Sequence, residues 1–360
     1  MPSVKNKLIA SLLVVAVTLP VIAIAKNTKP NPILDLYGTA GTVLVPPAPQ
    51  AAAAPPQPMA PAPDTADDPD PDAQATVAPV STAPVGILKM PAKQLFGMQK
   101  LPAQLPPAAI GGYALGCMAG AQALPRTGPT WQIMRPSRNR NWGTPQLIAE
   151  IERLSAEAKV KAGWNGLLVG DMAQPRGGPM KTGHASHQIG LDADVWFTPM
   201  PDKELSNKER ETMAPLEMVI DHKTLNRANW SESRAKLLQT VAQDPKVERI
   251  FMHPPIKAEM CRWAQTQPGD HSWLSKMRPL YGHTFHFHIR MKCPEGMTTC
   301  KSQGTPKPDD GTGCGKELAY WMSDQPWKKH PAPPGPPKPP PPPLTLASLP
   351  AECRAVIAAP

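Results

Sequence analysis

Histidine and aspartate side chains gather in two short stretches of the sequence that could together bind a metal ion. The stretches are GHASHQIGLDADVWF and GHTFHFHIRMKC, and their candidate residues are His184, His187, Asp194, His283, His286 and His288. Imidazole nitrogens and carboxylate oxygens are the usual ligands of catalytic zinc, which leaves one coordination position to water. Because no H-E-x-x-H motif occurs in the sequence, such a site must be built on strands and loops.

In the second stretch, the alternation of residue types predicts a β-strand. Phe287 and Ile289 alternate with His286 and His288. Because successive side chains of a strand point to opposite faces, both imidazoles project from one face while the apolar side chains pack on the other. The pattern therefore brings two histidines to one spot.

The first stretch predicts another strand, over residues 191–197, that carries a carboxylate. Apolar and polar residues alternate through this range, and Asp194 lies on the polar face. Gly190 directly precedes the strand, and its conformational freedom lets the backbone bend after His187. We therefore expect His187 and Asp194 to belong to the same site.

Further helices and strands are expected to support these two strands. Thr144-Pro145 is a typical helix start, and apolar residues repeat on one helical face up to about residue 160. Ser231 begins another helix that extends to about Asp244. GLLVGDM and VERIFMH read as short strands. Because strands and helices do not alternate regularly, we expect one α+β domain with a central antiparallel sheet.

Composition limits how much of the chain can fold. Of 360 residues, 50 are proline and only 5% are aromatic, so much of the sequence cannot enter a packed core. We expect a globular domain over 108–325, preceded by a Pro/Ala-rich, largely disordered linker over 26–107 and followed by a Pro-rich tail over 326–360. Cys353 lies near the end of this tail, and we expect a disulfide to tie it back to the domain.

Residues 1–25 have the features of an export signal. Two lysines precede an apolar run that ends in the small-residue site Ala23-Ile24-Ala25. The run is also long enough to remain as an N-terminal membrane tether. Export to the periplasm agrees with the six cysteines, which we expect to form disulfides whose pairing the sequence alone does not resolve.

The charge of the chain favours an anionic partner. A formal net charge of +9 and a pI near 9.2 are suited to attraction by cell-wall or envelope polymers. Nucleic acid is not expected as a partner, because the chain carries an export signal and lacks the interleaved aromatic and basic residues of single-strand binders.

Four motifs resemble those of the penicillin-insensitive murein endopeptidases, which belong to the wider lysostaphin and D-alanyl-D-alanine metallopeptidase group. The motifs are VGDMAQPRGG, TGHASHQIGLDADVW, RIFMHPPIK and HTFHFHIRMKCP. The similarity extends from Gly116 to the GTGCGKELAYW segment and leaves both Pro-rich regions outside. The resemblance implies a zinc endopeptidase that cleaves the D-alanyl to meso-diaminopimelate cross-link of peptidoglycan.

Matched position by position, the resemblance also implies roles for single residues. It implies that His187, Asp194 and His288 hold the zinc ion. His286 would act as a general base or stabilise the transition state. His283 and His184 match other active-site histidines of these enzymes.

A further metal position of the family is matched only in part. It uses an aspartate and a histidine three residues later; Asp221 matches the aspartate, whereas Thr224 stands at the place of the histidine. The adjacent His222 could substitute, so His184 and Asp221 remain candidate ligands. The resemblance also implies three disulfides, which are Cys117 with Cys353, Cys261 with Cys314, and Cys293 with Cys300.

Two other functions remain open from the sequence. One is the related carboxypeptidase reaction, which removes a terminal D-alanine. A basic residue that reads the terminal carboxylate would favour it, whereas a groove open at both ends would favour the endopeptidase. The other is a non-catalytic cell-wall-binding protein, which the intact set of candidate ligands disfavours.

Overall fold

The computed structural model describes residues 85–328 and 342–360. The expected signal, residues 26–84 of the expected linker and residues 329–341 of the tail lie outside the described residues. The strands are β1 Ala108–Gly112, β2 Leu115–Ala119, β3 Gln122–Ala123, β4 Thr127–Gly128, β5 Trp131–Ile133, β6 Trp142–Gly143, β7 Leu167–Val169, β8 Asp192–Pro199, β9 Val247–Met252, β10 Met277–Pro279 and β11 His286–Met291. The α-helices are α1 Val85–Leu88, α2 Ala92–Met98, α3 Pro145–Ala162, α4 Asn207–Thr212, α5 Glu232–Gln243, α6 Pro254–Ala264, α7 Lys316–Met322 and α8 Cys353–Ala358. The short 3-10 helices are η1 Pro136–Arg138, η2 Ser272–Lys276, η3 Gln325–Trp327 and η4 Leu346–Ser348.

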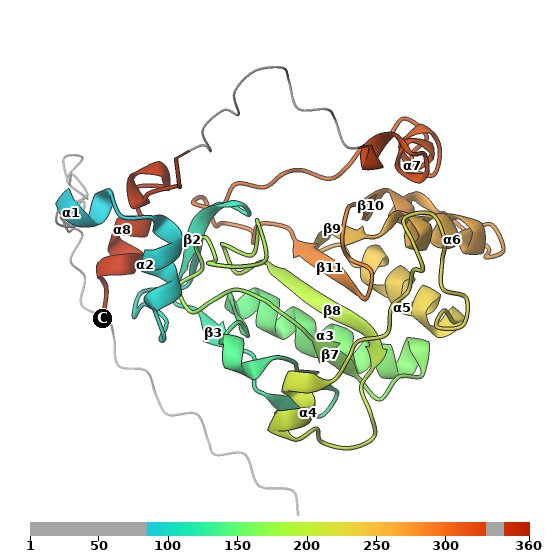
Figure 1. The fold of residues 1–360 in the computed structure, drawn as a ribbon, viewed down its shortest axis with the longest axis horizontal. Helices are drawn as coiled ribbons and strands as arrows, with labels where there is room; N and C mark the ends of the chain where they lie inside the picture. The colour runs from blue at the N-terminus through green and yellow to red at the C-terminus, as the bar shows by residue number, and fades with distance from the viewer. Residues whose placement is uncertain (1–84, 329–341) are drawn as a thin grey trace, which may run out of the picture. The chain divides into compact units, whose positions relative to one another are not determined.

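A seven-stranded mixed sheet with the order β10-β9-β11-β8-β7-β5-β4 forms the centre of the fold (Figure 1). Strands β8 and β11 carry residues of the two histidine-bearing stretches, and β11 pairs antiparallel with both β8 and β9. The expectation of an antiparallel sheet throughout is wrong, because β9 and β10 pair in parallel, as do β5 and β7. Parallel neighbours require a crossover connection, and helices α6 and α3 supply these two crossovers.

Helices α3 and α5 pack together and cover one face of this sheet (Figure 1). Helix α3 confirms the predicted start, since the Thr144 hydroxyl accepts the Leu147 backbone N–H at 3.3 Å. It ends at Gly163, whose φ of 70° is left-handed. The helices bury the apolar side chains of β8 and β11, among them Val195 and Ile289. The polar residues of both strands therefore face away from α3 and α5.

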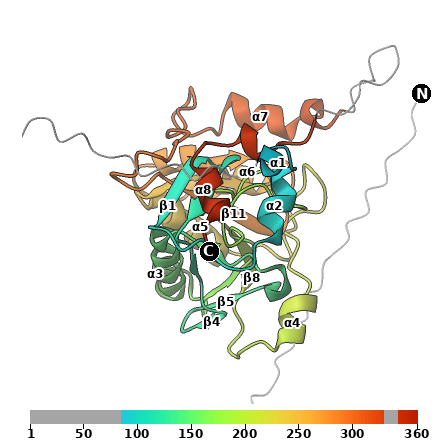
Figure 2. The ribbon, with the colours of Figure 1, turned by 90° about the vertical axis from the view of Figure 1, so that its left-hand side faces the viewer.

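A second apolar cluster joins α2, α8 and the β1–β2 hairpin, which lie together in both Figure 1 and Figure 2. The disulfide between Cys117 and Cys353 ties α8 to β2 and confirms the expected connection of the tail. Residues 85–107 belong to the segment that we expected to be a largely disordered linker, yet α2 buries Phe96 completely. A few apolar side chains suffice for this helix, because α8 and the hairpin supply the rest of the buried surface.

Phe96→Ala tests this packing. We expect the free energy of unfolding to fall by about 3 kcal/mol, because a buried ring is lost and a cavity remains. Denaturant unfolding of the variant measures the loss. Lys93→Ala, on the exposed face of the same helix, is the matched control and should leave stability nearly unchanged. Equal stability of both variants would contradict the packing of α2.

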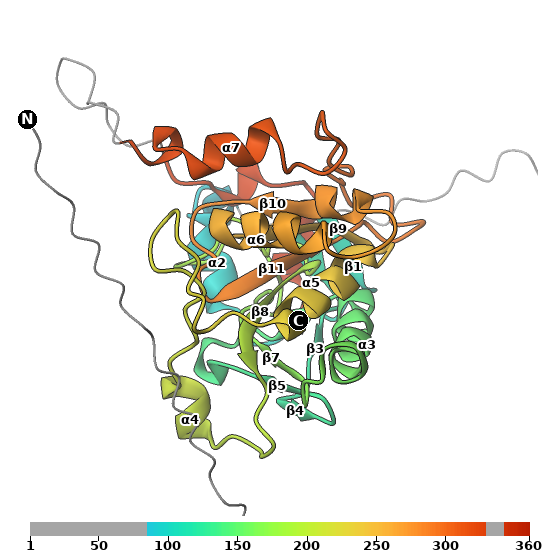
Figure 3. The same ribbon diagram turned by 90° about the vertical axis from the view of Figure 1, so that its right-hand side faces the viewer.

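The two other implied disulfides are also confirmed, Cys261 with Cys314 and Cys293 with Cys300. Cys261 lies in α6, which Figure 3 shows over β9 and β10 with α7 beside it. Across residues 85–328 and 342–360, every helix falls short of the length and apolar character that crossing a membrane requires.

Candidate metal centre

Strands β8 and β11 place their polar residues on one face, as the sequence predicts. In the antiparallel register, His288 lies opposite Asp194 and Arg290 lies opposite Asp192. All of these side chains are buried or nearly so, whereas the intervening residues of both strands enter the apolar core. The buried polar face is therefore the place where the two sequence stretches meet.

His187 reaches this face from the loop that precedes β8. The backbone of His187 has a left-handed φ of 64°, and Gly190 has a φ of 70°, which confirms the expected bend. A side chain at Gly190 would also collide with Met118, because a Cβ atom there would lie 2.0 Å from its sulfur. The bend thus requires glycine at position 190 and turns the His187 imidazole toward β8.

Hydrogen bonds on the outer nitrogens fix the tautomers of both histidines. The His187 Nδ1–H donates to the Met172 carbonyl oxygen at 3.1 Å, and the His288 Nε2–H donates to the Asp192 carboxylate at 3.0 Å. In the neutral rings, His187 Nε2 and His288 Nδ1 are therefore left with lone pairs. These two nitrogens face each other at 3.1 Å. Two lone pairs at this distance repel each other unless a proton or a metal ion lies between them.

Asp194 completes a set of three converging ligand atoms. Its Oδ1 lies 3.4 Å from His187 Nε2 and 3.3 Å from His288 Nδ1. This oxygen is buried and has no hydrogen-bond partner among the described residues. Tetrahedral zinc with bonds of about 2.0–2.1 Å separates its ligand atoms by roughly 3.3 Å. The three atoms therefore fit a zinc ion without rearrangement.

Two more histidines lie on the other carboxylate oxygen of Asp194. His184 Nε2 is 3.6 Å and His286 Nε2 is 3.7 Å from Asp194 Oδ2. The ligand atoms of His184, His187 and Asp194 also lie within 4.8 Å of one another. The nearest partner of His184 Nε2 is the Asp171 carboxylate, at 3.0 Å, whereas His288 Nδ1 lies 3.1 Å from His187 Nε2.

Asp171 belongs to this site, although our sequence reasoning did not assign it. Its Oδ2 also accepts hydrogen bonds from Arg138 at 3.0 Å and from Arg140 at 2.8 Å. Burial raises the pKa of Asp171, but the His184 hydrogen bond and the two arginine charges outweigh it and lower the pKa to about 2. Asp171 is therefore ionised. The signal in the sequence was an aspartate at the end of the short buried strand in GLLVGDM.

The remaining predicted histidine, His283, lies at the edge of the cluster. Its ring centroid is 4.9 Å from that of His286 and 6.0 Å from that of His288. Burial is the main cause that lowers the pKa of His283 to about 3, so its imidazole is neutral near pH 7. His283 thus lies beside His286 and is not one of the three residues whose side-chain atoms converge.

Asp221 is not brought into this cluster. It is exposed, and its Oδ1 accepts the backbone N–H groups of Lys223 and Thr224, which forms a local turn. The neighbouring His222 lies 3.6 Å from Asp324. Within the described residues, the group of potential ligands around His184 therefore does not include Asp221 or His222.

The Asp192 carboxylate contacts both His187 and His288. Its carboxylate accepts the backbone N–H of His187 at 2.9 Å in addition to the His288 Nε2–H. Arg290 neutralises it at 2.8 Å, and the guanidinium of Arg290 lies 4.3 Å from the Tyr113 ring centroid and 5.0 Å from that of Phe251. Asp192 thus orients the His288 ring on β11 and the loop that carries His187.

Asp192→Asn is expected to weaken zinc affinity by about 10- to 100-fold, because the amide holds the His288 tautomer and the His187 loop less firmly. Competition with a fluorescent zinc chelator measures the dissociation constant. Asp202→Asn replaces an exposed aspartate and serves as the control. Unchanged affinity in Asp192→Asn would contradict the orienting role.

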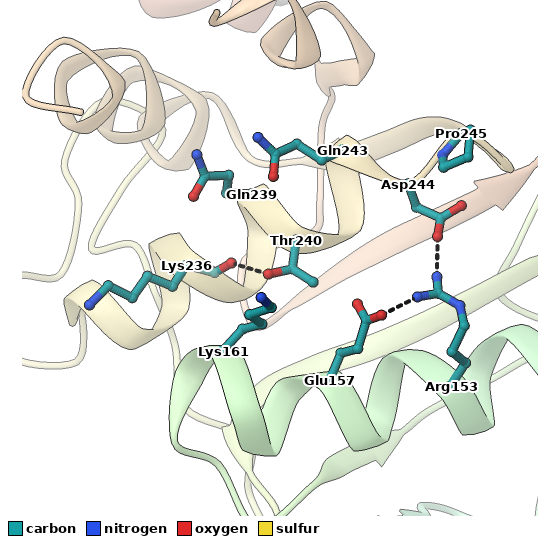
Figure 4. A pocket seen from close by; sticks show the side chains of 9 residues that line it. All are labelled: Arg153, Glu157, Lys161, Lys236, Gln239, Thr240, Gln243, Asp244 and Pro245. Carbon is teal, nitrogen blue, oxygen red and sulfur yellow. Dashed lines mark hydrogen bonds and ion pairs between the residues drawn. The ribbon is translucent and has the colours of Figure 1, made fainter. Parts of the chain in front are cut away.

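Two cavities help to place the chemistry. One, of about 340 Å³, borders the metal centre and has His184, Asp194, His286, Trp196 and Phe285 among its lining residues. The other, of about 500 Å³, lies between α3 and α5 and contains no histidine (Figure 4). Its lining residues include Arg153, which forms ion pairs with Glu157 and Asp244. Of these two cavities, the first is the one that the clustered histidines line.

The fold and this site together define an α+β protein with a buried His/Asp cluster suited to a divalent ion. A model of the penicillin-insensitive murein endopeptidase family matches residues 109–358. The chain belongs to this family.

Curated relatives agree with this assignment. The chain is 44% identical over 217 residues to a penicillin-insensitive murein endopeptidase of Haemophilus influenzae, which covers 59% of this chain and 72% of the relative. The identity to the protein of the same name from Yersinia enterocolitica is 41% over 233 residues, covering 63% and 82%. For one from Klebsiella pneumoniae it is 39% over 231 residues, covering 62% and 82%.

Proposed function

We propose that this protein is a zinc-dependent endopeptidase that hydrolyses the D-alanyl to meso-diaminopimelate cross-links of peptidoglycan. The observation that carries the proposal is the convergence of three lone-pair atoms, from His187, Asp194 and His288, at the separations that tetrahedral zinc requires. Membership of a family of murein endopeptidases supports peptidoglycan as the substrate.

His187, Asp194 and His288 would hold the ion, and His286 would handle the proton. A bound zinc ion supplies Lewis-acid polarisation and lowers the pKa of water. Burial, only partly offset by Asp194, lowers the pKa of His286, so its imidazole is neutral and able to accept a proton near pH 7. Its Nδ1 has no hydrogen-bond partner among the described residues, which leaves the ring free of a fixed tautomer.

One observation is compatible with the carboxypeptidase alternative as well as with the endopeptidase. Arg138 lines the cavity beside the metal centre and is a basic residue of the kind that reads a terminal carboxylate. The name that the curated relatives share favours the endopeptidase. A protein that only binds the cell wall would have no need for three converging side-chain atoms, two of them on histidine rings whose tautomers are fixed by hydrogen bonds.

Digestion of purified peptidoglycan separates these functions. The protein is incubated with it in the zinc-loaded form and after chelation, and the products are identified by mass. The endopeptidase converts cross-linked dimers into monomers, and the carboxypeptidase removes a single D-alanine. A wall-binding protein leaves both unchanged. Dimers that survive the zinc-loaded protein would refute the proposed function.

We further propose that the enzyme acts in the periplasm, with residues 1–25 as a cleaved signal or as a membrane tether. The mass of the protein recovered from membrane and soluble periplasmic fractions tests both forms. A protein that retains residues 1–25 and stays in the membrane fraction is tethered, whereas a shortened, soluble one has been processed.

A further inference from the structure

The backbone around η1 is strained in the same manner as the backbone of the site histidines. Among the described residues, the non-glycine residues with positive φ are Arg135, Asn139, His187 and His283. Two of these are site histidines, and the other two flank η1 on either side. Such conformations are costly and gather at functional sites. The strain around η1 therefore points to a functional side chain on it.

Contacts from α4 hold η1 in place. The Ser137 backbone N–H donates to Glu211 at 2.7 Å, and the Ser137 hydroxyl donates to the same carboxylate at 3.0 Å. Arg135 donates to the carbonyl oxygens of Arg210 and Met213, both at 2.8 Å. The position of η1 is thus fixed by several polar contacts, and both Nη groups of Arg135 are occupied.

Arg138, the last residue of η1, lines the cavity and keeps one edge of its guanidinium free. Its Nη1 donates to Asp171, whereas its Nε and Nη2 make no hydrogen bond within the described part of the chain. The side chain is 49% exposed, in contrast to 4% for Asp171. The free Nε–Nη2 edge has the spacing that binds a carboxylate through two parallel hydrogen bonds.

A short chain of contacts links Arg138 to the metal centre. Arg138 and His184 both contact Asp171 Oδ2 at 3.0 Å, and His184 Nε2 lies 3.6 Å from Asp194 Oδ2. The guanidinium is therefore separated from the ligand Asp194 by one carboxylate and one imidazole. A substrate whose scissile amide is at the metal centre would place the groups next to that amide within reach of Arg138.

We propose that Arg138 determines specificity by binding the free carboxylate next to the scissile amide, on the leaving-group side of the substrate. This inference rests on the proposed function. In the proposed cross-link, the amine that leaves belongs to a carbon that also bears a free carboxylate. A terminal D-alanine carries the same arrangement, so Arg138 fits the endopeptidase and the carboxypeptidase alike.

The test uses two cross-linked muropeptide dimers that differ in one group. In one, the carboxyl next to the scissile amide is free; in the other, it is amidated. We expect the wild-type zinc-loaded protein to prefer the free carboxylate in kcat/KM by about 10- to 100-fold. Arg138→Gln should reduce this ratio to about 1. Arg138→Lys keeps the positive charge but lacks the two parallel N–H donors of the guanidinium, so it should give an intermediate ratio.

Arg140→Gln is the matched control. Arg140 donates to the same oxygen of Asp171 at 2.8 Å but does not line the cavity. If activity falls only because Asp171 has lost one of its arginine hydrogen bonds, the fall will appear in both variants and with both dimers. We therefore expect Arg140→Gln to keep the preference for the free carboxylate. A preference lost equally in both variants, or kept in Arg138→Gln, would overturn the inference.

Binding without turnover separates this inference from the proposed function. Calorimetry on the metal-free protein, which is not expected to cleave the dimers, gives a dissociation constant for each. The free-carboxylate dimer should bind about 10-fold or more weakly to Arg138→Gln, while the amidated dimer binds the same. If the wild type binds with this preference but cleaves neither dimer when loaded with zinc, the proposed function is refuted, whereas the role of Arg138 in binding the carboxylate is upheld. If the dimers are cleaved without a preference for the free carboxylate, the proposed function is upheld and the role of Arg138 is refuted.

Discussion

His288→Ala is expected to abolish both zinc binding and peptidoglycan hydrolysis, whereas His286→Ala is expected to keep the zinc and lose nearly all turnover. His288 Nδ1 is one of the three converging ligand atoms, and its removal leaves two. His286 lies near the other oxygen of Asp194, at 3.7 Å, and is the proton acceptor in the proposed function. Loss of a general base reduces turnover by about 100- to 10,000-fold.

Metal content and turnover must be measured on the same samples. Elemental analysis after gel filtration gives the zinc per protein, and release of soluble muropeptides gives turnover. His271→Ala is the control, because His271 contacts only the Gln267 carbonyl among the described residues and should keep both properties. Equal zinc content and equal activity in His286→Ala and His288→Ala would refute the assigned roles.

The relation between the two histidine stretches could be predicted because strand periodicity is local. The alternation of His286 and His288 with apolar residues places them on one face, and pairing of β11 with β8 brings His288 opposite Asp194. Gly190 was informative for a similar reason, because a glycine directly before a predicted strand indicates a local backbone bend. The face of each residue and the bend are local features, whereas the pairing of β11 with β8 is a contact between distant segments.

Asp171 and Arg138 could not be found in this way, because their role depends on contacts between separate segments. Asp171 follows β7, Arg138 ends η1, and His184 lies in the loop before β8. Only the packed sheet brings the three together. The helix α2 is a similar case, because its few apolar residues become significant only against α8, near the other end of the chain.

Removal of the disulfide between Cys117 and Cys353 is expected to be the most destabilising change outside the metal centre. The bridge spans 236 residues, and both cysteines are fully buried. In the chain-entropy model, closure of so long a loop stabilises the fold by roughly 5 kcal/mol. Apolar packing against α2 and the β1–β2 hairpin would then hold α8, together with Arg176, which donates hydrogen bonds to backbone carbonyls that include Val356 at 2.8 Å and Ala359 at 2.7 Å.

Cys117→Ala combined with Cys353→Ala should therefore lower the free energy of unfolding by roughly 5 kcal/mol and Tm by about 10–20 °C. Replacement of Cys293 and Cys300, which are separated by only 7 residues, is the matched control. The same model gives roughly 2 kcal/mol for that short loop. Denaturant unfolding of both double variants, at one fixed zinc concentration, measures the difference. Equal losses would show that the long loop does not determine the stability, and that the two disulfides act through local packing alone.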